Sequence, residues 1–275
     1  MHKFSDGTVA PERIVEKARE LGLSCIAITD HDAVLAIEPA MREAKKLNIE
    51  IIPAVELSAE IDGCDIHILG YFIDWQAQWF KKKLEQICDV RQRRALAIIE
   101  KLRAFGINLD PDELMGQAAV GSVGRLHIAR LLQKQGFVYS VQEAFNKYIC
   151  NGHPCYVKKF KLTPAEAINI IRRLRGVAVL AHPHHIGKDE LIPELVQSGL
   201  RGLEVYCPEY DSAASKHYQS LAKKYGLLLT GGSDYHGPDK DRLSLGKIRI
   251  PYSLVEELKK EAQSSRKSPS AITLR

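Results

Sequence analysis

Short apolar runs alternate with amphipathic segments over the first seventy and the last hundred residues of the chain. In the amphipathic segments, apolar residues recur every three or four positions, as in Ile14, Val15 and Ala18, which is typical of helices. The predicted helices are Pro11–Leu21, Ala36–Leu47, Pro164–Leu174, Glu190–Gln197 and Ala213–Tyr225. The apolar runs predict strands at Cys25–Ile28, Ile49–Val55, Ile66–Phe72, Val177–Leu180, Gly202–Tyr206 and Leu227–Thr230. Strands alternating with helices predict an α/β fold built from parallel βα units.

This alternation stops near Trp75, where the chain turns to helical patterns alone. The helices expected there are 80–105, 111–115, 126–135 and 141–147. We therefore predict that residues 75–161 are a helical insertion in a single α/β unit formed by residues 1–74 and 162–262. The segment 263–275 is rich in Ser and Lys and is expected to be a disordered tail.

The composition is that of an ordinary globular protein, with 45% hydrophobic and 27% charged residues among 275. The net charge of +5 is unevenly distributed. Residues 75–161 hold 15 Lys or Arg and 7 Asp or Glu, so the predicted insertion carries +8 and the remainder −3. Two interpretations stay open: the basic insertion contacts a phosphate-bearing partner, or it is a solvated helical surface.

The six cysteines form no C-x-x-C pair, and we expect them to be reduced thiols. Cys150, His153 and Cys155 lie close in sequence, but a fourth zinc ligand is missing, so we assign them to a loop. The chain has no apolar run long enough to span a membrane and no signal sequence at its start. These features predict a cytoplasmic protein without membrane contact.

Acidic residues and histidines follow the ends of four predicted strands. These residues are Asp30, His31, Asp32, Glu56, His182, Asp234 and His236. In a barrel of parallel strands the carboxyl ends share one face, so these side chains are expected to converge there. Imidazoles and carboxylates without thiolates suit Zn²⁺, Mn²⁺ or Fe²⁺. His67 falls inside its apolar run; His184 and His185 are assigned to a loop and His217 to a solvated helix.

Six short motifs resemble those of the PHP family, the polymerase and histidinol phosphatase superfamily, in the order of that family. They are Ser5-Asp-Gly-Thr8, Ala27-Ile-Thr-Asp-His-Asp32, Val55-Glu56 with His67-Ile-Leu-Gly-Tyr71, Ala181-His-Pro183, Gly202-Leu-Glu-Val-Tyr206 and Gly232-Ser-Asp-Tyr-His-Gly237. The insertion, with Gly124-Arg-Leu-His-Ile-Ala-Arg130, resembles the TrpH-like subgroup. The resemblance implies a distorted (β/α)₇ barrel with an insertion subdomain and a site for two to three divalent ions (Mn, Fe or Zn).

The resemblance also implies a set of metal-binding and phosphate-binding residues. The implied metal ligands are Asp6, His31 and His236 for one ion; Glu56, His67 and His182 for a second; and Glu56 with Asp234 for a third, to which His2 is added. The implied phosphate-binding residues are Arg125, His127, Arg130, Lys158 and Lys159. The family's opening Asp-Leu-His-x-His has no full match before Ser5, so we expect the natural chain to begin upstream of Met1.

The activity implied by the resemblance is metal-dependent hydrolysis of phosphate esters. Members of the subgroup are similar to phosphatases of nucleoside 3′,5′-bisphosphates and to 5′-to-3′ exonucleases on short nucleic acids. Glu56 and Asp234 are the expected catalytic residues, with Asp32 or His127 assisting the leaving oxygen. The expected partner is a phosphorylated small molecule or a short nucleic acid, with no obligate protein partner.

Three alternatives remain open at this point. The first is a catalytically degenerate barrel that binds nucleotide or nucleic acid without cleaving it. The second is a structural or regulatory partner of a nucleic-acid enzyme. The third is a small-molecule phosphatase of the histidinol-phosphate type. The basic insertion favours a multiply charged substrate over this last one.

Overall fold

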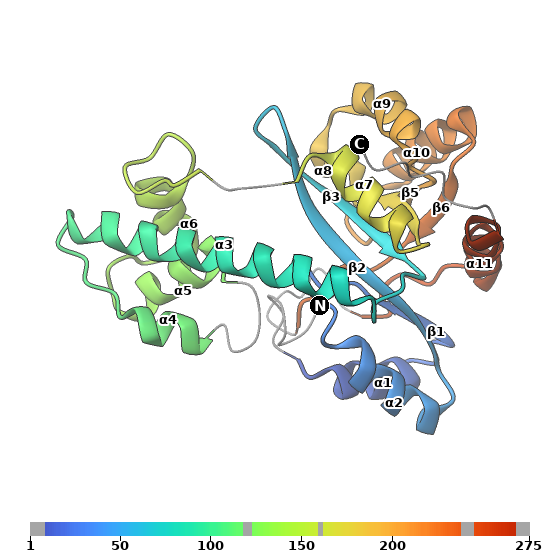
Figure 1. Ribbon diagram of the computed structural model, residues 1–275, viewed down its shortest axis with the longest axis horizontal. Coiled ribbons are helices and arrows are strands. Elements are labelled where there is room, and N and C mark those ends of the chain that lie inside the picture. Colours follow the sequence, from blue (N-terminus) through green and yellow to red (C-terminus); the bar gives the residue numbers. More distant parts are fainter. Residues whose placement is uncertain (1–8, 118–122, 159–161, 238–244, 268–275) are drawn as a thin grey trace.

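The computed structural model describes residues 9–117, 123–158, 162–237 and 245–267, which contain a curled six-stranded sheet with helices around it (Figure 1). The strands pair in chain order. They are β1 (Cys25–Ile28), β2 (Glu50–Ile61), β3 (Cys64–Tyr71), β4 (Val177–Leu180), β5 (Gly202–Tyr206) and β6 (Leu228–Gly231). Within these residues β1 pairs only with β2, and β6 only with β5. The described part of the chain thus supplies six strands, against the seven expected from the resemblance.

Strand β3 runs antiparallel to both of its neighbours, whereas the sequence pattern predicted parallel units throughout. Only Asp62 and Gly63 separate β2 from β3, and both have left-handed φ angles, 49° and 77°. Two such residues form a tight hairpin turn, and a parallel pair would need a crossover of a dozen residues or more. The prediction is therefore wrong at β3, although β1–β2, β4–β5 and β5–β6 are parallel.

The hairpin also changes the place of Glu56. Strand β2 continues to Ile61, so Glu56 lies in the middle of a strand and not after its end. It pairs with Leu69 of β3 in the register of the hairpin. Glu56 thus joins the other polar residues from within the sheet.

Besides the start of a longer helix described below, five helices of the described residues pack with the sheet around the largest cluster of buried apolar side chains. They are α1 (Pro11–Glu20), α2 (Ile37–Leu47), α7 (Pro164–Arg173), α9 (Ile192–Ser198) and α10 (Ser212–Tyr225). A smaller cluster includes Leu69 and Tyr71 of β3 and Leu258 of α11 (Tyr252–Lys267). Ile68 belongs to the first cluster and Leu69 to the second, because successive side chains of a strand point to opposite faces.

Helix α11 reaches Lys267, so residues 263–267 are helical and the expected tail cannot begin at 263. The Ser-rich composition misled the prediction, because the apolar residues Val255, Leu258 and Ala262 bring the helix onto the sheet. No helix in the described ranges combines the length and the apolar character that a membrane span requires.

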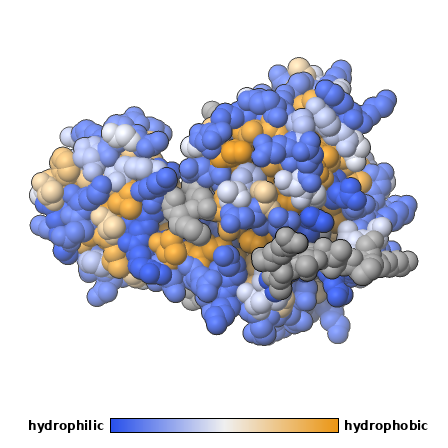
Figure 2. Space-filling model, turned by 45° about the horizontal axis from the view of Figure 1, so that its top comes forward, coloured by the Kyte–Doolittle hydropathy of each residue, from blue (hydrophilic) through white to orange (hydrophobic). Residues whose placement is uncertain are grey.

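A second group of helices forms its own lobe beside the sheet (Figures 1 and 2). It comprises α3 (Gln78–Arg103), α4 (Pro111–Gln117), α5 (Arg125–Lys134), α6 (Val141–Ala144) and the π-helical turn η1 (Phe145–Ile149). Its buried apolar residues form a separate cluster between Ala95 and Cys155. Helix α3 is 26 residues long and belongs to both parts, since Phe80 and Leu84 near its start join the main cluster.

Leu102 is completely buried in the cluster of the helical lobe. We expect Leu102→Ala to lower the free energy of unfolding by about 2–5 kcal/mol, because the truncation removes apolar contacts and leaves a cavity. Urea denaturation followed by circular dichroism measures the change. Lys82→Ala, at an exposed position of the same helix, serves as the control and should be nearly neutral. An unchanged unfolding curve for Leu102→Ala would contradict this packing.

Candidate metal centre

Backbone pairing beyond the end of β1 brings His31 next to Glu56. The N–H of Glu56 donates to the carbonyl of Asp30 at 3.1 Å, and the N–H of Asp32 donates to the carbonyl of Glu56 at 3.0 Å. These bonds continue the parallel ladder past β1, so that His31 forms a bridge with Glu56. The residues that the sequence placed in a loop after the strand are therefore held by backbone hydrogen bonds to β2.

Two more histidines reach the same place from β3 and from the end of β4. His67 lies opposite Ser58, two residues along β2 from Glu56. The N–H of Ala181 donates to the carbonyl of His67 at 3.1 Å, which fixes the start of the loop containing His182. Three chain segments far apart in sequence thus converge on one carboxylate.

Oxygen Oε1 of Glu56 is the centre of the cluster. It lies 2.9 Å from His67 Nδ1, 3.4 Å from His182 Nε2 and 3.9 Å from His31 Nδ1. His67 Nδ1 and His182 Nε2 are 3.1 Å apart. Glu56 is 3% exposed, which places its carboxylate in a protein environment and not in water. We call these four residues the Glu56 cluster.

Asp234 and His236 follow β6 and border the Glu56 cluster. The His236 and His31 rings lie 6.4 Å apart between centroids. His236 Nδ1 is 2.6 Å from the carbonyl oxygen of Asp234 and 3.6 Å from its Oδ1. The charge of Glu56 contributes to a raised pKa at Asp234, after the larger effect of burial, which shows that the two carboxylates influence each other.

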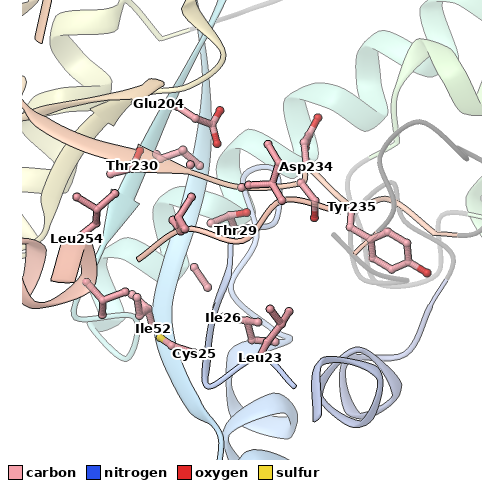
Figure 3. A pocket seen from close by; sticks show the side chains of 18 of the residues that line it. Leu23, Cys25, Ile26, Thr29, Ile52, Glu204, Thr230, Asp234, Tyr235 and Leu254 are labelled. Atoms are coloured by element: carbon pink, nitrogen blue, oxygen red, sulfur yellow. The ribbon is translucent and has the colours of Figure 1, made fainter. Parts of the chain in front are cut away.

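Asp234 also lines a cavity of about 360 Å³ between β1 and β6. Figure 3 shows Asp234 and Glu204 at this cavity, with Thr29 below them in this view and apolar side chains such as Ile52 and Leu254 further away. Glu56 and His182 belong to the same lining. The cavity is therefore polar where it meets the Glu56 cluster and mainly apolar elsewhere.

Three residues of this region have a left-handed backbone that glycine normally adopts. The φ angles are 47° at Asp32, 31° at His182 and 47° at Asp234. Such conformations cost about 1–3 kcal/mol each and persist only where surrounding contacts enforce them. All three lie in this one region. We infer that the fold accepts unfavourable backbone conformations here because they place these three side chains at the site.

Glu204 is a contributor that the sequence analysis did not assign. It lies in the middle of β5, is 5% exposed, and its Oε2 accepts a hydrogen bond of 2.9 Å from the N–H of His182. This bond holds His182 in its left-handed conformation. The available signal was a single acid inside the otherwise apolar strand Gly202–Tyr206.

Burial and neighbouring charges have opposite effects on the pKa values of Glu56, His182 and Glu204. Burial opposes ionisation of Glu56, but the imidazoles of His31, His182 and His67 outweigh it and hold the pKa of this carboxyl well below its usual range. Burial likewise disfavours the charged form of His182, yet Glu56 and Glu204 raise its pKa to about 9. At Glu204, burial raises the pKa to about 7 despite the charge of His182. Glu56 is therefore an ionised carboxylate surrounded by imidazoles, and this arrangement favours the binding of positive charge.

The donor set fits a divalent cation. His31, Glu56 and His67 each offer a ligand atom within 4.8 Å of the other two. Oε1 of Glu56 is buried, and no hydrogen bond of ordinary geometry from a described residue satisfies it. Imidazole nitrogens and carboxylate oxygens are ligands that Zn²⁺, Mn²⁺ and Fe²⁺ take in proteins. Among the described residues this is the only such group, so Cys150, His153 and Cys155 do not form one, and Cys155 is buried in the core of the helical lobe.

Asp32 forms an ion pair with an arginine of helix α3. Its Oδ1 accepts from the N–H of Ser58 at 3.0 Å, and its Oδ2 forms an ion pair with Arg91, whose guanidinium also donates to Ser58 Oγ at 3.0 Å. These donors hold the Asp32 carboxylate in place, and its role in assisting a leaving oxygen stays a prediction. Arg91 was not predicted, since nothing in a helical charge pattern shows which arginine faces the sheet.

The phosphate-binding residues predicted in the insertion lie on or near α5. Arg125 donates to the carbonyl of Ile149 at 3.4 Å, and its guanidinium lies over the Phe145 ring. His127 is 8% exposed and its Nδ1 accepts from the N–H of Gly124, so one ring nitrogen helps to begin the helix. Arg130 is half-buried and Lys158 exposed. Three predicted residues, His2, Asp6 and Lys159, lie outside the described residues.

Arg94 adds a further cation to this region. Its Nε donates to the carbonyl of Val157 at 2.8 Å. Burial, and next the charge of Arg125, lower the pKa of Arg94 to about 10, so the two guanidiniums lie close together. The charge of Arg91, on the same helix, also lowers the pKa of Arg94. Cations therefore extend along α3 from Asp32 to α5.

Known proteins are similar to this chain in sequence and in fold. The chain is 33% identical over 244 residues, 85% of its length and 82% of the relative's, to the 5′-3′ exoribonuclease Rnm of Escherichia coli K12. It is 28% identical over 250 residues, 89% and 88% of the two chains, to the 3′,5′-nucleoside bisphosphate phosphatase of Chromobacterium violaceum. A Bifidobacterium adolescentis structure, provisionally assigned as a metal-dependent phosphoesterase, superposes with a TM-score of 0.84 and 27% identity, covering 94% of this chain and 93% of the other.

The family comparison covers the first half of the molecule. The PHP domain matches residues 2–149, which include His31, Glu56, His67 and the helices of the insertion. The resemblance first noted in short motifs thus extends to continuous sequence and to the whole described fold. On this evidence the chain belongs to the PHP domain family.

Proposed function

We propose that this chain is a metal-dependent phosphoesterase that hydrolyses phosphate esters of nucleotides. The observation that carries the proposal is the Glu56 cluster, in which three histidines from separate segments face one buried carboxylate oxygen. The relatives named as an exoribonuclease and a nucleoside bisphosphate phosphatase support this class of reaction.

His31, Glu56, His67, His182, Asp234 and His236 are the proposed ligands within the described residues, and Asp6 and His2 are added on the family resemblance alone. Two to three divalent ions of Mn, Fe or Zn suit this donor set. When bound, such ions activate water at neutral pH and neutralise phosphoryl oxygens. The seven-stranded barrel of the family also stays a prediction for this chain.

The chain's own residues position the substrate and exclude water around it. Glu56 stays ionised in a buried site, and Glu204 fixes His182 through its backbone, so the donors need not rearrange when substrate arrives. Arg125, Arg130, Lys158 and Lys159 are the proposed phosphate contacts, because guanidinium groups bind phosphate oxygens in pairs. His127, next to Arg125 on the same helix, is proposed to assist them.

We further propose that residues 75–161 are an insertion subdomain on a barrel formed by 1–74 and 162–262. The separate buried cluster between Ala95 and Cys155 supports this division. The +8 charge of that segment favours a substrate with several phosphates, such as a nucleoside 3′,5′-bisphosphate or a short oligonucleotide. A PHP barrel that binds nucleotide without cleaving it is the second candidate, and turnover separates the two.

The test is phosphate release from adenosine 3′,5′-bisphosphate with added Mn²⁺, compared with a metal-free reaction. We expect metal-dependent release from the wild type and a loss of at least about a hundredfold for Glu56→Gln, since the amide lacks the charge that binds the cation. Bound metal is measured on the same samples. Glu60→Gln, on the same strand, is the control and should remain active. Wild-type turnover by Glu56→Gln would contradict the proposed centre.

Removing the Glu204 carboxylate should weaken the centre without touching a proposed ligand side chain. We expect Glu204→Ala to reduce metal affinity and kcat roughly 10- to 100-fold, as is usual for groups that hold a ligand in place. Glu204→Gln should recover most of the loss, because its amide oxygen can still accept the His182 N–H bond. Equal activity of the Ala and Gln variants would show that this hydrogen bond has no such role.

The Arg91–Asp32 pair predicts an effect on stability. Asp32 has a side chain only 1% exposed, so Arg91→Ala removes a paired cation from a buried carboxylate. We expect a loss of about 3–5 kcal/mol in the free energy of unfolding. Asp32→Asn combined with Arg91→Ala should recover part of it, because the buried charge is then absent. Arg93→Ala, exposed on the same helix, is the control in urea denaturation.

A further inference from the structure

Two exposed imidazole rings and one half-buried tyrosine ring lie beside the Glu56 cluster. They belong to His184 and His185 of the short helix α8 (Pro183–Ile186) and to Tyr210 in the loop between β5 and α10. We call these three residues the ring shelf. None of them belongs to the proposed metal or phosphate contacts, and the sequence analysis assigned both histidines to a loop.

The ring shelf begins one ring away from the metal centre. The centroids of His185 and His182 are 5.5 Å apart, with 30° between the ring planes. His184 lies 5.2 Å from Tyr210, and His185 lies 6.2 Å from it, both in edge-to-face arrangements. A continuous path of rings therefore leads from a proposed metal ligand to the surface.

The ring shelf is held in place by a hydrogen bond between two of its residues and by packing on Tyr218. The N–H of His184 donates to the hydroxyl of Tyr210 at 3.1 Å, which ties α8 to the loop. Tyr218 of α10 is buried and its ring lies 5.9 Å from that of Tyr210 and 6.3 Å from that of His184. A rigid surface of this kind binds a flat ligand without a large ordering cost.

The His185 end of the ring shelf is exposed and so is accessible to a ligand. The His185 side chain is 46% exposed, and its Nε2 lies 2.9 Å from Glu209 Oε2. Glu209 is itself partly exposed, so a hydrogen-bond acceptor borders the rings. Exposed rings next to an acceptor match the two features of a nucleobase, a π-face and an edge with amino groups.

We propose that the ring shelf binds the base of a nucleotide whose phosphate lies at the Glu56 cluster. The inference rests on the proposed function, because only a phosphate at the cluster fixes where the base falls. Stacking on rings accepts any base, so the shelf favours nucleotides over other phosphate esters without selecting a sequence. Glu209 adds a contact for bases that carry an exocyclic amine.

The experiment compares adenosine 3′,5′-bisphosphate with the abasic 1-deoxyribose 3,5-bisphosphate, which keeps the 2-hydroxyl and lacks only the base. For the wild type we expect kcat/KM to be roughly 10- to 100-fold higher with the base present, which is the usual gain from stacking. His185→Ala should remove most of this difference by raising KM for the adenosine compound, with little change for the abasic one. His185→Phe keeps a ring and should restore the preference.

His217→Ala is the matched control. His217 is also an exposed histidine, and its ring lies 5.0 Å from Tyr218, which supports the ring shelf, but it pairs with Asp189 and not with the Glu56 cluster. Its removal should leave both substrates unchanged. A wild type that hydrolyses both compounds equally well would overturn the ring shelf and leave the proposed function intact.

If neither compound is hydrolysed, the proposed function fails, and binding decides the question of the shelf. The fluorescent 1,N⁶-etheno-adenosine 3′,5′-bisphosphate is titrated with each variant and followed by anisotropy. Weaker binding to His185→Ala alone, restored in His185→Phe, supports a base at the shelf. Equal binding to all variants overturns it.

Discussion

The buried carboxylate of Glu56 is the constraint on which the site depends. An ionised acid in the interior is unfavourable unless positive charge or hydrogen bonds surround it. Here His31, His67 and His182 approach a single oxygen within 3.9 Å; His67 comes from β3, and the other two follow the ends of β1 and β4. The sheet therefore has to bring those strands together in one register, and the curled arrangement of β1 to β4 does so.

Holding the donors in this position requires support from the next layer of residues. Asp32, His182 and Asp234 have left-handed backbones, which are unfavourable for residues with side chains. At His182 the compensation is visible, since Glu204 accepts its N–H from inside the neighbouring strand. At Asp32 it is the ion pair with Arg91 and the bond from Ser58. The rigidity that a preorganised centre needs is thus built from buried polar pairs.

Arg91 also connects the two parts of the molecule. Helix α3 packs Phe80 and Leu84 into the core of the sheet and Leu102 into the core of the helical lobe. Between these ends, Arg91 and Arg94 face the Glu56 side and α5 respectively. Because α3 is one continuous helix about 39 Å long, it fixes the position of one core relative to the other. The basic lobe is in this way fixed beside the acidic and imidazole-rich centre.

The sequence by itself determined the α/β class, the bounds of most helices and strands, and the chemical type of the site. Apolar periodicity and strand-end polar residues carry that information locally. Only the tertiary structure decided that β3 runs antiparallel, that Glu56 lies within a strand, and that Glu204, Arg91 and the ring shelf border the centre. These features depend on contacts between residues far apart in the chain, whose partners no local pattern specifies.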